Sequence, residues 1–513
     1  MGRLEIHFEM SLFRVKSLDE LNAEAVRPEQ QLRRALGPVQ LTLLGIGAII
    51  GAGLFSTVGT AAAGGSGHIG AGPALVVSFV LVAIACGFAA LCYAEFASMV
   101  PVSGSAYTYA YATLGQLMAW IIGWDLILEY AVGNVAVAIS WSEYFQTLLR
   151  GLQVNWPAWL GVDYRTALDA AKTAADNTDP GTLSDSLLRA ARAWKEAPRL
   201  AGVPLVFNLP AVLITALLTW ILVRGIRESS AFNTIMVVLK LTVVGLFIGV
   251  GTFYIRPENW SPFSPNGFQG ISSAAGVIFF AYIGFDAVST AAEETRDPQR
   301  NLPIGIIASL IVCTVFYVAA ALVLTGMVPW KEFTGAADPL AKAFSERGMN
   351  WTAGLISLGA VFATTSVLLV YQLGQPRILF SMARDGLLPA WAARVHPRYR
   401  TPHIPTILTG VFVAGLSAVA NINEMADVCS IGTLFAFVLV AAGIIVLRRI
   451  DPNRPRPFRT PWVPWVPLGA ILSCGYLMMA LPKEAWVRFA VWLAIGMVIY
   501  FAYSHRNAQR QRQ

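Results

Sequence analysis

Lys240 is a charged residue in an otherwise apolar stretch, with MVVL before it and LTVVGLFIGV after it. In a helix with a rise of 1.5 Å per residue it would lie roughly 12 Å from the start of that stretch. A lysine at the centre of a membrane costs about 2.5 to 3.5 kcal/mol, so it needs a partner or must lose its proton part of the time. An amine that exchanges its proton is a proton carrier. We expect this role for Lys240; the alternative is a long stem that snorkels to the surface.

Acidic side chains occur in two other apolar segments. The sequence WDLILEY places Asp125 and Glu129 four residues apart, which puts them on one face of a helix. We expect Glu129 to face a cavity, whereas Asp125 can equally make a contact between helices. Further along the chain, Asp286 precedes Glu293 and Glu294. We expect these three acids to form an inner gate or a surface ion network with nearby arginines.

Glycines interrupt two apolar segments that lie five segments apart. Residues 45–55 read GIGAIIGAGLF, and residues 279–287 read FFAYIGFDA with Gly284 in the middle. Glycines at GAIIG spacing alone would favour close packing between helices. Irregular backbone at membrane depth, however, is tolerated only where protein or a water-filled cavity satisfies it. Two breaks at matching positions of inverted repeats together form a midplane binding site, and the pair therefore predicts such a site.

The chemistry of this predicted site comes from the main chain. Unwinding between Gly51 and Gly53 creates a half-helix whose free N–H groups and partial positive charge suit a carboxylate. Carbonyl groups freed before each break suit an ammonium group, so the two together suit an α-amino acid. The neighbouring side chains of Ile49, Phe280 and Ile283 are apolar. They predict a pocket for an apolar ligand side chain.

The composition places the whole chain in a membrane. Of 513 residues, 56% are hydrophobic and 13% charged, and the mean hydropathy is +0.59, whereas globular domains are about 25% charged. Because about 20 apolar residues cross a bilayer, we predict an all-α integral membrane protein with twelve transmembrane helices. The predicted spans are 39–63, 73–97, 114–148, 208–223, 232–254, 272–290, 303–328, 352–383, 405–422, 428–447, 462–481 and 486–503.

Composition also argues against several other kinds of chemistry. All five cysteines fall in apolar stretches, without zinc-ligand spacing, and the five histidines lie outside the spans or at their edges. We therefore predict no metal, no cofactor and no disulfide framework. The net charge of +7 is scattered among short loops, which argues against nucleic acid. No set of nucleophile, base and orienting group marks an enzyme.

The basic residues predict the orientation of the chain. With both termini cytoplasmic, inside segments hold 23 Lys and Arg and the short outside loops hold six, as the positive-inside rule requires. Residues 1–38 form a cytoplasmic segment that is too long and too charged for a signal peptide, and Met10 is an alternative start. Residues 504–513 form a cytoplasmic tail. The stretch 150–207 is expected to be an external helical cap broken at Asp-Pro-Gly.

Four long motifs carry a resemblance to a known family. They are LTLLGIGAIIGAGLF (41–55), YAEFASMVPVSGSAYTYAYATLGQLMAWIIGWDLILEY (93–130), FFAYIGFDAVSTAAEETRDPQRNLPIGI (279–306) and YQLGQPRILFSMARDGLLP (371–389). The chain resembles bacterial members of the amino acid, polyamine and organocation superfamily, and within it the cationic amino acid transporter family. The resemblance implies a leucine-transporter fold. Its inverted repeats would be residues 39–254 and 271–447, with broken helices 1 and 6, followed by two additional helices in 462–503.

The resemblance also implies roles for individual residues. Substrate would be bound by Ile49, Gly51, Ala52, Gly53, Phe280 (as a lid), Ala281 and Ile283, next to the Glu129 cavity. Lys240 would take the place of a cation, facing the carbonyl near Gly47 and a hydroxyl of Thr364 or Thr365. Ala52 stands where the family pattern has a hydroxyl, so contacts from that side chain are lost but not those from its N–H group.

These expectations combine into one predicted function, a proton-coupled symporter that takes up L-amino acids by alternating access in the bacterial inner membrane. The apolar pocket favours neutral aliphatic substrates, and Glu129 leaves a cationic side chain open. The alternatives are an amino acid or polyamine exchanger and a non-transporting amino acid sensor. The expected partners are the amino acid, protons and lipid; the sequence does not fix the oligomeric state, and a monomer is compatible with it.

Overall fold

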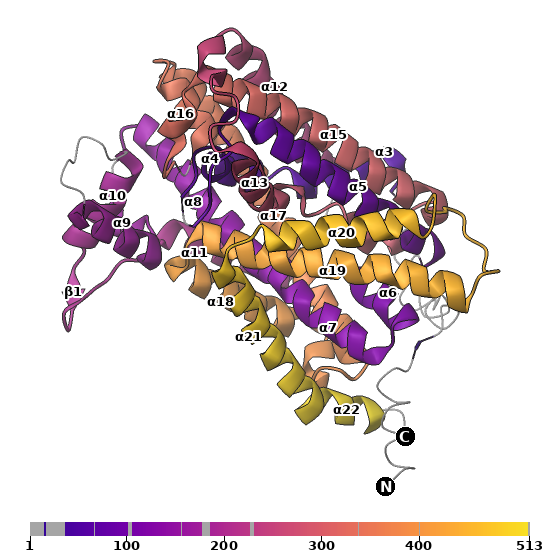
Figure 1. Cartoon of the computed structure of the whole chain (residues 1–513). Coiled ribbons are helices and arrows are strands. Elements are labelled where there is room, and N and C mark those ends of the chain that lie inside the picture. The colour runs from indigo at the N-terminus through magenta and orange to yellow at the C-terminus, as the bar shows by residue number, and fades with distance from the viewer. Residues whose placement is uncertain are drawn as a thin grey trace.

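The chain folds into a bundle of long helices packed side by side (Figure 1). The computed structural model describes residues 15–16, 36–65, 67–100, 105–154, 156–176, 185–225, 230–336, 338–399 and 401–510. The alternative start at Met10 lies outside these residues, as does the expected Asp-Pro-Gly break. Within the described chain, the β-structure is a hairpin of β1 (Arg199–Leu200) and β2 (Val203–Pro204) and two isolated bridges.

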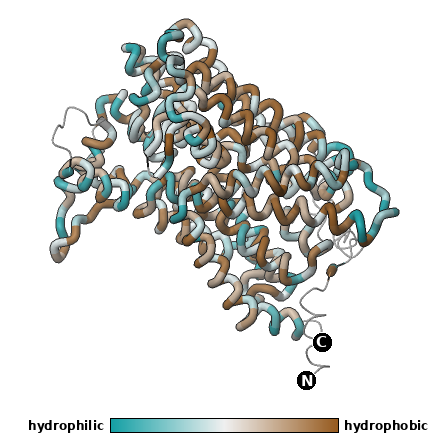
Figure 2. The backbone as a smooth tube through the Cα atoms, in the orientation of Figure 1, coloured by the Kyte–Doolittle hydropathy of each residue, from teal (hydrophilic) through white to brown (hydrophobic). Residues whose placement is uncertain are grey.

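Eight helical segments of the described chain are long and apolar enough to cross a membrane. They are η3 and α5 (Gly72–Ala74, Leu75–Met99), α7, η4 and α8 (Gln116–Ile127, Leu128–Val132, Gly133–Gly151), α12 (Ser230–Thr252), α13 and α14 (Gly267–Tyr282, Ala287–Thr290), α15 (Pro298–Met327), α17 (Asn350–Arg384), α19 (Ile422–Ile450), and α21, η11 and α22 (Lys483–Ile499, Tyr500–Ser504, His505–Arg510). Figure 2 shows hydrophobic colour along these helices and hydrophilic colour at the connections. The protein is a multi-pass membrane protein.

A ninth span results when α3 (Pro38–Ile49) is joined to η2 (Gly53–Thr57) and α4 (Val58–Ala63), which are bent against it by 41°. Three shorter apolar helices are α11 (Leu209–Arg224), α18 (His403–Val419) and α20 (Trp465–Met479). Each lies where the sequence predicted a span.

The remaining helices are short or polar. They are α6 (Ser105–Thr113), α9 (Tyr164–Asp176), α10 (Asp185–Glu196), α16 (Pro339–Ser345) and the 3₁₀ turns η5 (Ala158–Leu160), η7 (Pro257–Trp260), η8 (Ala292–Glu294), η9 (Trp330–Phe333) and η10 (Ala390–Ala393). Helices α9 and α10 pack together through an edge-to-face contact of Tyr164 with Trp194, 5.2 Å between ring centroids. With β1 they project from one end of the bundle, and α22 and the loop after α19 lie at the other end (Figure 1).

The first break separates α3 from η2. Ile50 leaves the helical conformation with φ −75° and ψ 103°, and the backbone bends at Gly51 before the π-helix η2 begins. Helix α3 begins with Pro38 in its first turn, where a missing N–H costs nothing. The break contains no proline and no charged residue. The glycines are therefore the sequence feature that coincides with the unwinding.

The second break separates α13 from α14. Helix α13 ends at Tyr282, Ile283 is extended, and Gly284 has φ +123°. This conformation strongly favours glycine. A Cβ atom on Gly284 would also lie 2.9 Å from the carbonyl carbon of Ala48, so the residue must be small for a second reason.

Glu95 anchors the connection between α19 and α20 to the end of α5. Its carboxylate accepts two hydrogen bonds from Arg448 (2.9 and 2.8 Å), one from Nε of Arg456 (3.1 Å) and one from the amide of Thr460 (2.8 Å). The side chains of Glu95 and Arg456 are both 0% exposed. Charge-assisted bonds of this kind are the stronger hydrogen bonds in proteins, and here they hold a proline-rich segment in place.

We predict that Glu95→Gln destabilises the protein by about 3 to 5 kcal/mol, because it leaves the Arg456 guanidinium buried without its counter-charge. The thermal unfolding midpoint of the purified protein in detergent measures the effect. Asp451→Asn is the matched control: its ion pair with Arg454 spans 3.6 Å and its side chain is 42% exposed, so a change of about 0 to 1 kcal/mol is expected. Equal midpoints for the two variants would contradict the prediction.

Candidate functional site

The two helix breaks lie against each other in the middle of the bundle. A Cβ atom on Gly53 would lie 2.2 Å from the Cα atom of Ala281. On the other side, Gly284 touches Ala48. Main chain of the first broken helix therefore packs directly on main chain of the second, as the pairing of the two glycine motifs predicted. All of these residues are buried.

The amide groups of Gly51, Ala52 and Gly53 stand at the beginning of the second half-helix. Its first backbone hydrogen bonds run from the amides of Leu54 and Phe55 to the carbonyl oxygen of Gly51, 3.1 Å in both cases. The amides that precede them have no partner within that half-helix. A helix start of this kind attracts anions, so these three amides can bind a carboxylate.

Apolar side chains surround the paired breaks. Ile49 is 2%, Ile283 1% and Phe280 5% exposed. Phe279, the neighbour of Phe280, stacks edge-to-face on Phe437 at 5.8 Å, but the described chain offers Phe280 itself no aromatic partner. Its ring is not fixed by stacking. Ala52 adds only a methyl group to this surface, and its side chain offers no hydrogen bond.

Two tyrosines that the sequence analysis did not single out bind the carbonyl groups freed at the breaks. The hydroxyl of Tyr317, on α15, lies 2.9 Å from the carbonyl oxygens of both Ile49 and Ala281. The hydroxyl of Tyr371, on α17, donates to the carbonyl oxygen of Ile283 at 3.3 Å. Tyr317 therefore connects the two broken helices directly. A tyrosine in an apolar segment was the available signal, since a buried phenol needs a partner.

Lys240 also binds the first break. Its side chain is 0% exposed, and its ammonium nitrogen donates to the carbonyl oxygens of Gly47 and Ile50, with 3.2 Å to Ile50. Gly47 belongs to the last turn of α3, whose carbonyl groups lack partners within the helix. The lysine thus points at the unwound backbone and does not snorkel to the surface.

The hydroxyl groups of Thr364 and Thr365 do not bond to Lys240, contrary to what the family resemblance implied. Thr364 donates to the carbonyl oxygen of Ala360 at 2.7 Å in its own helix, α17. Thr365 donates to the carbonyl oxygen of Val361 at 2.7 Å and accepts from Trp141 at 2.8 Å. Threonines inside helices commonly bond back to the preceding turn, and here the carbonyl of Ile50 replaces them as the second partner of the lysine.

Glu129 and Asp286 form a buried acidic pair. Glu129 lies in the π-helix η4, a local form that is frequent at functional sites. Its carboxyl group lies close enough to that of Asp286 for the two to interact, and Asp286 also accepts a hydrogen bond from the Tyr130 hydroxyl at 3.4 Å. Asp286 is 0% exposed, so its expected place in a surface ion network is wrong: the chain after Gly284 turns it inward. Asp125 lies against Gly432 of α19, a contact between helices.

Metal-binding residues do not gather in the described part of the chain, where no group of three or more His, Cys, Asp or Glu could hold an ion. The five cysteines, Cys86, Cys92, Cys313, Cys429 and Cys474, are buried free thiols. The polar groups that the site presents are therefore main-chain amides and carbonyls, one lysine, two tyrosines and the acidic pair.

Comparison with known sequences identifies the family. A model of the amino acid permease family matches residues 36–502. The chain belongs to this family. It is thus a transporter rather than an enzyme, and the resemblance to the amino acid, polyamine and organocation superfamily is confirmed.

Three relatives illustrate the range within the family. The branched-chain amino acid permease BcaP of Bacillus subtilis (strain 168) is 48% identical over 97% of this chain and 99% of its own length. The methylthioribose transporter of the same organism is 44% identical over the same shares. The cationic amino acid transporter 9, chloroplastic, of Arabidopsis thaliana is 37% identical over 91% of this chain and 77% of its own.

We predict opposite effects on stability for two glycine-to-alanine changes. Gly53→Ala places a methyl group into the backbone of Ala281 and is expected to cost about 1 to 3 kcal/mol by overpacking. Gly245→Ala, on α12, meets no atom within 4 Å and is expected to stabilise its helix by up to about 1 kcal/mol. Thermal unfolding of the purified variants tests this, and a Gly53→Ala midpoint at or above that of the unchanged protein would refute the close contact.

Proposed function

We propose that the protein is a secondary active transporter that takes up L-amino acids together with protons. The observation that carries the proposal is the contact between the two broken helices next to their breaks, where Gly53 packs against Ala281, with Lys240 bonded to Gly47 and Ile50 at the first break. Paired broken helices are where transporters with inverted repeats bind their substrates. Membership of the amino acid permease family supports the same conclusion.

In the proposed site, the substrate carboxylate binds the amides of Gly51, Ala52 and Gly53. The ammonium group binds carbonyl oxygens next to the breaks; each carbonyl oxygen has two lone pairs, so one that already accepts from Tyr317 or Tyr371 can accept again. The aliphatic side chain of the substrate lies against Ile49, Phe280, Ala281 and Ile283. A relative named a branched-chain amino acid permease, 48% identical, supports a neutral aliphatic substrate.

The buried pair of Glu129 and Asp286 is compatible with a substrate that has a cationic side chain. Oε2 of Glu129 and Oδ1 of Asp286 are buried and without a hydrogen-bond partner in the described chain. Such atoms can accept from an additional ammonium or guanidinium group. The relatives named cationic amino acid transporters are 37% identical or less, so we rank neutral substrates first.

Lys240 carries the coupling to protons in this proposal. While protonated, it holds the carbonyl groups of Gly47 and Ile50 and keeps the first break in a shape that binds substrate. Loss of its proton toward the cytoplasm loosens these bonds and releases the substrate. Thr364 and Thr365 lie on the adjacent helix α17 and would act only after a rearrangement.

The architecture in this proposal has twelve spans and the leucine-transporter fold. The eight long segments, the bent pair α3 and α4, and the three shorter apolar helices support this number. Residues 39–254 and 271–447 form the inverted repeats, and 462–503 adds two helices. Both termini are cytoplasmic and the membrane is the bacterial inner membrane, with residues 1–38 and 504–513 inside and 150–207 outside.

We predict that branched-chain amino acids raise the unfolding temperature of the purified protein more than any other of the twenty amino acids. Apolar burial of an extra methylene is worth about 0.8 kcal/mol in such a pocket, which favours leucine, isoleucine and valine over alanine. A thermal-shift screen that also includes methylthioribose, arginine and lysine measures this. A larger shift with methylthioribose, or with the cationic amino acids, would overturn the substrate assignment.

We predict that Lys240→Met abolishes uptake driven by a proton gradient, because methionine fills the space without carrying a proton. Proteoliposomes with an acidic exterior and radiolabelled leucine measure the uptake, and counterflow between leucine inside and outside measures binding and exchange. Lys172→Met, at an exposed position of α9, is the matched control. Undiminished gradient-driven uptake by Lys240→Met would contradict the proposal that Lys240 couples transport to protons. Strict dependence of the unchanged protein on internal substrate, without a response to pH, would identify an exchanger.

A further inference from the structure

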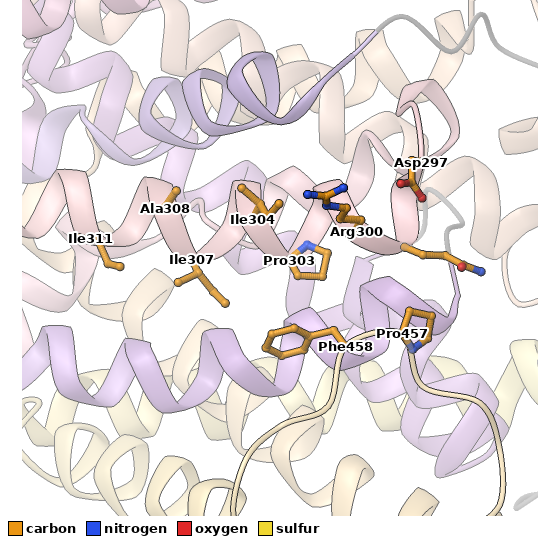
Figure 3. A pocket seen from close by; sticks show the side chains of 10 residues that line it. Asp297, Arg300, Pro303, Ile304, Ile307, Ala308, Ile311, Pro457 and Phe458 are labelled. Carbon is orange, nitrogen blue, oxygen red and sulfur yellow. The ribbon is translucent and has the colours of Figure 1, made fainter.

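A cavity of about 630 Å³ opens at the beginning of α15, next to the loop that follows α19 (Figure 3). Its two ends differ in polarity. Asp297, Gln299 and Arg300 line one end, and Ile304 and Ile311 line the other. In Figure 3 the Arg300 side chain lies near Pro303, and the isoleucines follow along the same helix.

A second cavity, of about 540 Å³, continues from the apolar end and runs between α15 and α5. The two cavities share Ile307 and Ile311. The one hydroxyl in its lining belongs to Thr314 and is bonded to the carbonyl oxygen of Leu310 at 2.8 Å. The second cavity therefore offers hydrocarbon alone, and together the cavities form one groove, polar at its first end, which we call the α5–α15 groove.

The α5–α15 groove lies on a surface that faces the membrane. Ile84 of α5 is 51% exposed, and Ile311 and Val315 of α15 are 59% and 63% exposed. Both helices are membrane spans by length and hydropathy. Exposed apolar side chains on such helices contact lipid rather than water. The groove therefore opens into the bilayer.

Two arginines occur at or next to the polar end of the groove: Arg300 lines it, and Arg459 adjoins its lining along the chain. Arg300 and Arg459 are exposed, and Arg459 directly follows Phe458, which lines the cavity. Asp297 supplies one opposing negative charge at the same end. Basic pockets between membrane helices bind anionic lipid headgroups, and the order of polarity along the groove is that of a glycerophospholipid.

We propose that the α5–α15 groove binds one anionic glycerophospholipid, with its phosphate at Arg300 and one acyl chain between α5 and α15. The acyl chain fills the aliphatic part of the groove, and the headgroup lies between α15 and the loop that Glu95 anchors. The site is separate from the paired breaks, so it stands whether or not the proposed transport function holds. It does, however, contact α15, the helix that carries Tyr317.

Filling the groove from the protein side tests the acyl-chain part of the proposal. Gly87 lines the second cavity, and a Cβ atom on it would meet no atom within 4 Å. The Cβ atom of Gly87→Leu therefore has room, and the rest of the side chain extends the apolar lining into the groove. Gly415→Leu, on α18, is the matched control, since a Cβ atom there also meets nothing within 4 Å. Leucine is the better helix former at both positions, so neither change threatens folding.

The measurement is the binding of phosphatidylglycerol to the delipidated full chain in detergent, by native mass spectrometry and by thermal shift. The unchanged protein and Gly415→Leu are expected to retain one tightly bound molecule. Gly87→Leu is expected to bind it about tenfold more weakly, as displacement of about two methylenes requires. Equal retention by Gly87→Leu and Gly415→Leu would overturn the proposal.

The headgroup part is tested with Arg300→Gln and, as a control, Arg394→Gln at another exposed arginine. Arg300→Gln is expected to remove the preference for phosphatidylglycerol over phosphatidylcholine with the same acyl chains, while Arg394→Gln keeps it. A thermal shift of equal size with inorganic phosphate alone would mean an anion site without lipid and would refute the proposal. So would a dimer of the unchanged protein that Gly87→Leu dissociates, because the groove would then be an interface between two copies.

Discussion

Main-chain polar groups cannot remain unpaired in the interior of a membrane protein, and this constraint organises the centre of the bundle. Two helices are broken there, so carbonyl groups that would face the next turn of a helix face other elements instead. Lys240 donates to two of them, Tyr317 shares its one hydroxyl proton between another two, and Tyr371 donates to a fifth. These side chains come from α12, α15 and α17. Three intact helices are thereby tied to the two broken ones through hydrogen bonds to main chain.

In the proposed mechanism, the same bonds would let protonation of Lys240 change the shape of a substrate site made of backbone. A charged ammonium group offers three donors, whereas a neutral amine offers two and no net charge. Loss of the proton therefore weakens the hold of Lys240 on Gly47 and Ile50, which flank the unwound segment. Since the Tyr317 hydroxyl lies 2.9 Å from the carbonyl oxygens of both Ile49 and Ala281, the proposed mechanism would transmit a shift of the first break to the second through this one side chain.

The sequence predicted these features where the signal was local, and missed them where it depended on tertiary contacts. Glycines in an apolar run located both breaks, and a lysine flanked by aliphatic residues located the partner of the first. The tyrosines gave no periodic or spacing signal, because their partners are carbonyl groups on other helices. The surface position considered for Asp286 was wrong for a related reason: the turn at Gly284 decides which way its side chain points. The four hydrogen bonds of Glu95 join segments more than 350 residues apart, which no local pattern encodes.

A site built from main chain also accounts for how one family can serve different substrates. Main-chain amides and carbonyls are the same whatever side chains surround them, so they can recognise what all amino acids share. In the proposed site, specificity would then depend on the few side chains next to the variable part of the substrate, which are Ile49, Phe280, Ile283 and the pair of Glu129 with Asp286. Phe280 is the largest apolar side chain of this set and is 5% exposed, so in the proposed site it would contribute the largest apolar contact area. Ala52 is consistent with this view. Its side chain is a methyl group and has no hydroxyl, so in the proposed site only its backbone N–H group could bind the substrate.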